Sequence, residues 1–378
     1  MAHVLEALNA RCEGLKDAEA IEMREGVFTA FLPTAVAFGA AGEFERQTMD
    51  EIRTAISLQR EASGEGILGL NIEAGSGFIK LLAKLWQEDA RGFHGETIAD
   101  VKLQLGRRTA DATLAATLND LITFFCDGLG LKAIQPENFN IGKPHDLFAD
   151  FAEPRDFACI YGTQSLRDLA RTLGRDVLPR IRILSGDEEG QIVFAAIIPE
   201  ADHKRPGTVA VEIGSGSTEI VCVADDGDLL PLTVAIGART TEPPLKALEG
   251  FLRTGDARPD LQDLLESPPD TVTAFFGRKP SPVTDLFVNP SRASVTYRGF
   301  AHARSTISGD DGIQLDQDMV EAYNQIHGQD GFAPKAGILL TVANGLGLHS
   351  FREGRKGGLK EGIAVLLAEG LTALAHPG

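Results

Sequence analysis

The order of apolar and polar residues along the chain predicts strands alternating with helices. Apolar side chains recur every three or four residues over 112–129, which predicts an amphipathic helix. Short apolar runs at 157–161 and 180–184 predict strands, and the apolar segment 191–198 predicts a further helix. Such alternation is typical of α/β proteins.

The first 65 residues predict a different kind of segment. Residues 6–20 and 48–62 carry apolar side chains at helical spacing, and the small, acidic segment 61–66 indicates a boundary. Between the helices, residues 26–42 are apolar enough to pack on another surface, as a structural cap or a contact between copies. We therefore expect a helical N-terminal extension over residues 1–65.

The middle of the chain contains a glycine-rich turn between two β-rich runs, 209–213 and 220–223, which predicts a β-hairpin. Such turns are common in structural roles. Glycines lack the Cβ atoms that would block an anion, so backbone N–H groups of the turn could point at one phosphate. Glu212 and Glu219 add carboxylates that could hold a metal or a water. The expected phosphate-binding residues are Gly214, Ser215, Gly216, Ser217 and Thr218.

A second stretch, residues 70–82, repeats the order apolar, Glu, small, Gly, Ser, Gly and then an apolar run. Glu73 corresponds to Glu212, and Gly75, Ser76 and Gly77 form the matching turn. Two glycine hairpins of this kind predict two similar halves facing one cleft. A polyphosphate or nucleotide between them would meet donors from both sides.

Length and composition narrow the class of protein. A chain of 378 residues favours two domains, possibly three. The net charge of −18 argues against binding nucleic acid through a basic surface, although a polyanionic substrate remains compatible with bound metal. The longest apolar runs are too short to span a bilayer, and the four scattered cysteines favour a cytoplasmic protein with reduced thiols.

Five motifs, taken in order, share the sequence and spacing of one enzyme family. They are Gly-Thr-Gln-Ser-Leu-Arg-Asp at 162–168, Leu-Ser-Gly-Asp-Glu-Glu-Gly at 184–190, Val-Glu-Ile-Gly-Ser-Gly-Ser-Thr-Glu at 211–219, Ala-Ile-Gly-Ala-Arg-Thr-Thr-Glu at 235–242 and Gly-Leu-Lys-Glu-Gly at 358–362. Together they resemble the exopolyphosphatase / guanosine pentaphosphate phosphatase (Ppx/GppA) family, within the actin-like, sugar-kinase-like ATPase superfamily. The resemblance spans roughly residues 66–372.

This resemblance implies a fold and an activity. The fold would be α/β, with two actin-like (ribonuclease H-like) domains flanking an active-site cleft, at residues 66–170 and 171–378. The activity would be a Mg²⁺-dependent phosphohydrolase that releases terminal phosphate from inorganic polyphosphate or guanosine pentaphosphate. The resemblance further implies a homodimer.

The resemblance also assigns roles to residues. Glu189 would act as the base or orient the attacking water, with Glu188 and Asp168 as its partners. Arg167 would bind phosphate, and Glu73 and Glu212 would hold the metal. Acidic pairs in front of a helix also serve as N-terminal caps, so a purely structural role for Glu188 and Glu189 stays open.

Two departures from the family pattern support a second hypothesis. Glu73 and Glu212 stand where the family has aspartate, and Gly77 and Phe78 replace the usual Asn and Ser. A longer carboxylate shifts a bound metal or water, and a displacement of about 1 Å can cost about 100-fold in rate. The alternative is therefore a catalytically weak member that senses a phosphorylated ligand. A kinase of the same superfamily is less favoured, because no adenosine-binding Gly-Gly motif is recognisable.

Overall fold

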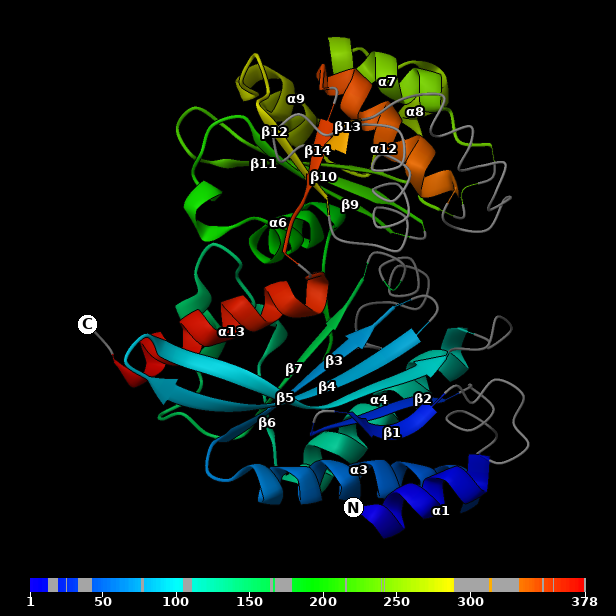
Figure 1. The fold of residues 1–378 in the computed structure, drawn as a ribbon, viewed down its shortest axis with the longest axis vertical. Coiled ribbons are helices and arrows are strands. Elements are labelled where there is room, and N and C mark those ends of the chain that lie inside the picture. The colour runs from blue at the N-terminus through cyan, green and yellow to red at the C-terminus, as the bar shows by residue number, and fades with distance from the viewer. Residues whose placement is uncertain are drawn as a thin grey trace. The chain divides into compact units, whose positions relative to one another are not determined.

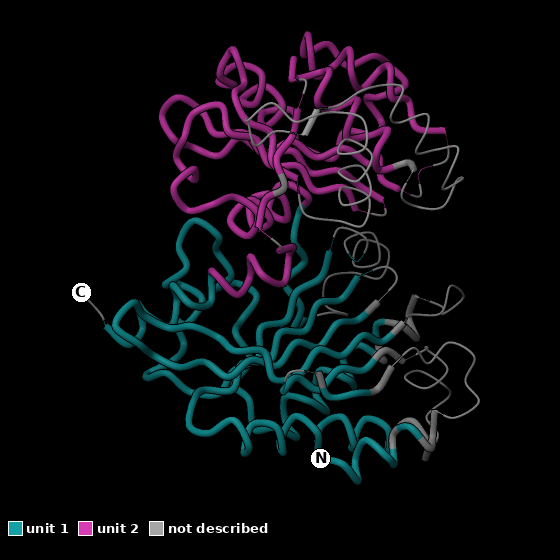
Figure 2. Tube along the Cα trace, viewed as in Figure 1, with its two compact units in different colours: residues 1–185, 366–378 teal, residues 186–365 magenta. Residues whose placement is uncertain are grey.

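The computed structural model forms two compact units (Figure 2). Unit 1 contains residues 1–185 and 366–378, and unit 2 contains residues 186–365. The expected domain boundary at residue 170 thus lies at Ser185, and the end of the chain returns to unit 1. The structure describes residues 1–12, 20–24, 26–32, 43–75, 78–104, 111–163, 166, 179–214, 216–238, 240, 242–288, 313–314, 333–348, 350–355 and 357–376.

The sheet of unit 1 is built on a three-stranded antiparallel meander, followed by strands that return in parallel on its other side (Figure 1). β3 pairs with β4, and β4 pairs with β5. On the opposite side of β3 lies β7 in parallel, and β7 in turn pairs with β8 and with the short β6. The bounds are β3 Ile67–Ala74, β4 Phe78–Asp89, β5 Gly92–Gln104, β6 Lys132–Ala133, β7 Phe157–Gly162 and β8 Arg182–Ile183.

Helices cover both faces of this sheet. The helix α4 (Asp111–Leu129), predicted from apolar spacing, is confirmed, and it shares a core with α3 (Glu43–Ser63) and one sheet face. The opposite face carries the end of α13 (Leu359–Ala375) (Figure 1), where the Thr372 hydroxyl accepts a hydrogen bond from Phe93 N at 3.1 Å. The short helices η1 (Pro136–Asn138) and η2 (Pro144–Phe148) connect α4 to β7.

The N-terminal segment differs from the helical extension we expected. It contains α1 (Ala2–Cys12), β1 (Ala20–Arg24), β2 (Val27–Leu32) and α3. β2 pairs in parallel with β5, so this segment adds two strands to the sheet of unit 1. Phe28 is fully buried, which confirms that this apolar stretch packs on another surface. Helical spacing alone could not reveal the open edge of β5, whose backbone groups need partners.

The sheet of unit 2 follows the same plan. β9, β10 and β11 form an antiparallel meander, β12 pairs in parallel with β9, and β14 pairs in parallel with β12. The short strand β13 pairs with β14. The bounds are β9 Thr208–Ile213, β10 Thr218–Val223, β11 Leu229–Val234, β12 Asp285–Val288, β13 Ile313–Gln314 and β14 Ser350–Glu353. The chain is therefore mixed α/β with two similar sheets, as predicted.

The two faces of this second sheet bury different helices. α6 (Gly186–Ile197) packs on one face, where Val193 and Phe194 meet Ala210 and Val221. The other face carries a larger core, formed with α7 (Leu245–Thr254), α8 (Pro259–Gln262), α9 (Pro269–Arg278) and α12 (Ala333–Leu346). The turn η4 (Glu200–Asp202) follows α6. Among the described residues, none of the helices combines the length and apolar character that a membrane span needs.

Candidate functional site

The predicted hairpin of unit 2 places two glutamates side by side. Strand pairing sets Glu212 of β9 directly opposite Glu219 of β10. Because side chains alternate along a strand, both lie on the sheet face that carries Ala210 and Val221, which is the face covered by α6. The hairpin therefore presents its carboxylates toward the helix that begins with the acidic motif.

Glu219 lies in an environment that disfavours its charged form. It is only 5% exposed, and the Ser217 hydroxyl donates a hydrogen bond to its Oε1 at 2.6 Å. Burial raises the pKa of Glu219 well above its usual range, and the charges of Glu189, Glu212 and Glu266 raise it further, against the lowering effect of Ser217. Three neighbouring carboxyl groups thus act on Glu219 in this part of unit 2.

The start of α6 brings Glu189 to this cluster. The helix begins five residues before the segment we predicted, so Asp187, Glu188 and Glu189 form its first turn. A Cβ on Gly186 would lie 2.4 Å from Thr233 Cγ2, and one on Gly190 would lie 3.2 Å from Glu219 Cβ. The two glycines therefore allow the first turn to lie closely against β10 and β11.

The first acidic residue of the motif, Asp187, is hydrogen-bonded within the fold. Asp187 accepts hydrogen bonds from the hydroxyls of Thr233 (3.2 Å) and Ser267. Ser267 also accepts from the backbone N–H of Thr233 at 2.7 Å, which ties the helix start to β11. Acidic residues in a first turn also complement the helix dipole. Asp187 thus anchors the helix start to β11, while the charge of Glu189 reaches Glu219.

The glycine loop of unit 2 is held by the stretch that follows it. Gly214 N donates to Ser217 O at 2.9 Å, and Ala238 N donates to Gly214 O at 3.0 Å. The buried Thr218 hydroxyl donates to Ile236 O at 2.6 Å, so it is occupied by the backbone. Gly216 is exposed, and no atom lies within 4 Å of the position that its Cβ would take. The tip of the loop thus has room for a ligand.

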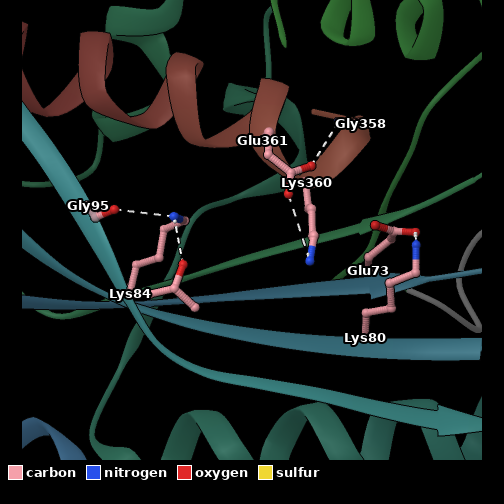
Figure 3. A network of polar contacts seen from close by, with 8 residues as sticks. Glu73, Lys80, Lys84, Gly95, Gly358, Lys360 and Glu361 are labelled. Carbon is pink, nitrogen blue, oxygen red and sulfur yellow. Dashed lines mark hydrogen bonds and ion pairs between the residues drawn. The ribbon is translucent and has the colours of Figure 1, made fainter. Parts of the chain in front are cut away.

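In unit 1, Glu73 is the last but one residue of β3 and Gly75 follows the strand. Glu73 is buried and forms an ion pair with Lys80, which strand pairing places directly opposite on β4 (Figure 3). Five predicted site residues lie outside the described residues: Ser76, Gly77, Arg167, Asp168 and, in unit 2, Ser215.

The motif at 358–362 has a structural explanation. Glu361 accepts a hydrogen bond from Gly358 N at 2.8 Å and so caps the start of α13 (Figure 3). A Cβ on Gly362 would lie 2.1 Å from Ile192 O, so only glycine allows α13 to pack this closely on α6 within unit 2.

Sequence reasoning did not single out several residues that shape these sites. Lys80, Thr233, Ser267 and Glu266 were not anticipated. Lys80 was detectable in principle, because a seven-residue separation across a short hairpin places it opposite Glu73. Thr233, Ser267 and Glu266 come from distant segments and carry no motif.

A divalent metal fits unit 2 better than unit 1. Among the described residues, no group of three or more His, Cys, Asp or Glu side chains could hold a metal. Mg²⁺, however, usually binds one or two carboxylates and completes its shell with water and phosphate oxygens. Glu212 and Glu189 are the candidate ligands in unit 2, since the charges of both reach Glu219. Glu73 already has Lys80 as its counter-charge.

Comparison with known proteins gives structural likeness only. No protein-family model and no curated protein sequence matches the chain. A solved Aquifex aeolicus Ppx/GppA phosphatase is 13% identical, with a TM-score of 0.43, over 80% of this chain and 99% of its own. An exopolyphosphatase from Cytophaga hutchinsonii is 15% identical, with a TM-score of 0.43, over 80% of this chain and 98% of its own.

In each unit, a three-stranded meander is followed by parallel strands beside its first strand. This arrangement is the one expected from the resemblance to the actin-like superfamily. TM-scores below 0.5 and identities of 13–15% carry no argument about the reaction. The chemistry must therefore be argued from the residues.

Proposed function

We propose that this protein is a phosphohydrolase that releases terminal phosphate from inorganic polyphosphate or guanosine pentaphosphate. The observation that carries the proposal is the gathering of Glu189, Glu212 and Glu219 on one face of the sheet of unit 2. The glycine loop that follows Glu212 has an open tip at Gly216, where backbone N–H groups can meet a phosphate.

The residues can perform the reaction as follows. Glu189 takes a proton from a water molecule while the oxygen of that water forms a bond to the terminal phosphorus. The bond from that phosphorus to the bridging oxygen breaks, which leaves orthophosphate and a chain shorter by one phosphate. Hydrolysis of this kind depends mainly on positioning and on stabilising charge at the transferring oxygens. Burial favours the neutral form of Glu219, and we assign the role of base to Glu189 and that of metal ligand to Glu212.

Glu212 would hold Mg²⁺, which when bound neutralises charge on the phosphate oxygens. A bound cation also offsets the repulsion between a protein of net charge −18 and a polyanionic substrate.

The test is phosphate release from long-chain polyphosphate and from guanosine pentaphosphate, with and without Mg²⁺. We expect Glu189→Gln to lower release by about 100- to 10,000-fold, the usual effect of a general base. The matched control is Glu200→Gln, the same change on the exposed turn η4 of the same unit.

Absence of release by a folded wild-type protein that still binds either compound would contradict hydrolysis. It would instead support the sensor hypothesis, in which the same loop binds a phosphorylated ligand without cleaving it.

A further inference from the structure

Charged residues lie beside Glu73 on the face of unit 1's sheet that points away from the core shared with α3 and α4. Leu70 and Ile72 of β3 belong to the apolar core, so Glu73 points to the opposite face. On β4 the core takes Ile79 and Leu81, which leaves Lys80 on the same face as Glu73. Pairing then sets Lys102 of β5 opposite Lys80. One row across three strands thus reads glutamate, lysine, lysine.

Within this row, Glu73 is neutralised by a group built into the fold. Its side chain is 8% exposed and that of Lys80 is 32% exposed, and Lys80 Nζ donates to Glu73 Oε1. Glu73 Oε2 is buried and accepts no hydrogen bond from any residue that the structure describes. The ammonium is fixed by strand register, because the two residues are direct cross-strand neighbours.

A divalent ion bound to Glu73 would lie at ion-pair range from this ammonium, with a second lysine beside it. Like charges at such distances repel strongly in a partly buried site. The second carboxylate oxygen suits a hydrogen-bond donor such as water, which adds no charge. The donor set of unit 1 therefore does not fit the metal that the family resemblance places at Glu73.

We propose that Lys80 is the resident cation of the first glycine loop and that Glu73 binds no divalent metal. The carboxylates of unit 2 bind the metal instead. This inference rests on the proposed function for the metal's role. It concerns metal binding, however, and can be tested without any reaction.

The experiment titrates Mn²⁺ into the metal-free full-length protein and measures free Mn²⁺ by electron paramagnetic resonance, without substrate. We expect Glu73→Gln to leave Mn²⁺ affinity unchanged, while Glu212→Gln weakens it by about 10- to 100-fold. Glu73→Gln also preserves side-chain shape, so it tests the proposal even if larger changes impair folding. Equal weakening by both substitutions would overturn the proposal.

A gain of binding provides the second arm. Lys80→Met should create a Mn²⁺ site that disappears again in the Lys80→Met, Glu73→Gln double variant. The matched control is Lys84→Met on the same strand, since Lys84 donates to Gly95 O (3.2 Å) and Thr97 Oγ1 (3.0 Å) (Figure 3). No gain in a Lys80→Met variant that folds normally would contradict the proposal. Normal Mn²⁺ binding without phosphate release would contradict only the proposed function.

Discussion

The two glycine hairpins share their sequence plan, yet they place different groups beside their carboxylates: an ammonium in unit 1 and a carboxyl in unit 2. Lys80 follows Glu73 by seven residues, and Glu219 follows Glu212 by the same seven. In both hairpins this residue lies directly across the strand pair from the glutamate. Unit 1 thus forms an ion pair where unit 2 forms a carboxyl pair. Repetition of a motif repeats the backbone, whereas the residue opposite the motif decides the chemistry.

The largest effect is expected from making unit 2 resemble unit 1. Glu219→Lys would place an ammonium beside Glu212 and Glu189, which would exclude a metal and pair with the base. We expect phosphate release to fall by about 100-fold or more, the scale of losing one preorganised electrostatic group. Phosphate-release kinetics check this, with Glu219→Gln as the uncharged control and circular dichroism to verify folding. Release close to that of the wild type would show that the two hairpins are interchangeable.

Breaking the ion pair of unit 1 should have a smaller effect, on stability. Lys80→Met leaves the buried Glu73 without its counter-charge, and we expect a loss of about 1–3 kcal/mol in the free energy of unfolding. Glu212→Gln should cost less, because it removes repulsion in unit 2. Denaturant unfolding of Lys80→Met, of Glu73→Gln and of the double variant measures the coupling energy of the ion pair. A coupling energy of zero would mean that the pair contributes nothing to folding.

The carboxyl pair of unit 2 should appear as a pH dependence of stability. The pKa of Glu219 is raised in the folded state, so its contribution is fully present below the ordinary carboxyl value of 4.5 and is lost as pH rises toward the raised value. Relative to wild type, Glu219→Gln should lack this decline, which amounts to at most about 1.4 kcal/mol per pH unit for one proton. Denaturant unfolding between these pH values measures it. Parallel stability curves for the two proteins would argue against a buried neutral carboxyl.

The smallest expected effect is on the alkylation of the buried thiols. Each unit has one of these thiols on a strand of its sheet. Burial raises the pKa of Cys159 on β7 and of Cys222 on β10 to about 12, and that of Cys126 on α4 to about 11. These three thiols should resist alkylation at pH 8 in the native protein. Mass spectrometry after pulse labelling in rising denaturant would show whether the two units open separately. Rapid native labelling of Cys159 or Cys222 would contradict their burial.

The sequence predicted the parts of the fold that depend on local pattern. Helix α4, the hairpin of β9 and β10 and two similar halves follow from apolar spacing and from a repeated motif. Strands β1 and β2 were missed because their partner, the edge of β5, is distant in sequence. The early start of α6 was missed because it depends on Gly186 packing against Thr233, which lies forty-seven residues later in the chain.

For the candidate site, the motifs identified Glu212 and Glu189 but not their surroundings. The burial of Glu219 and the approach of Glu266 depend on how α6 and the segment after β11 pack on the sheet. Lys80 lies seven residues after Glu73 across a short hairpin, so its position opposite Glu73 was open to prediction from strand register. It was missed because lysine is an ordinary surface-type residue.

The path of the chain through its two units also constrains how the protein can be made. Unit 1 includes the end of α13, whose Thr372 bonds to Phe93 on β5, although these residues are near opposite ends of the chain. During synthesis unit 2 is therefore complete while unit 1 still waits for its last helix to leave the ribosome. A fragment ending at Ser185 would lack this cover over one face of the sheet. Unit 1 should accordingly be produced with the C-terminal segment joined to it by a short linker.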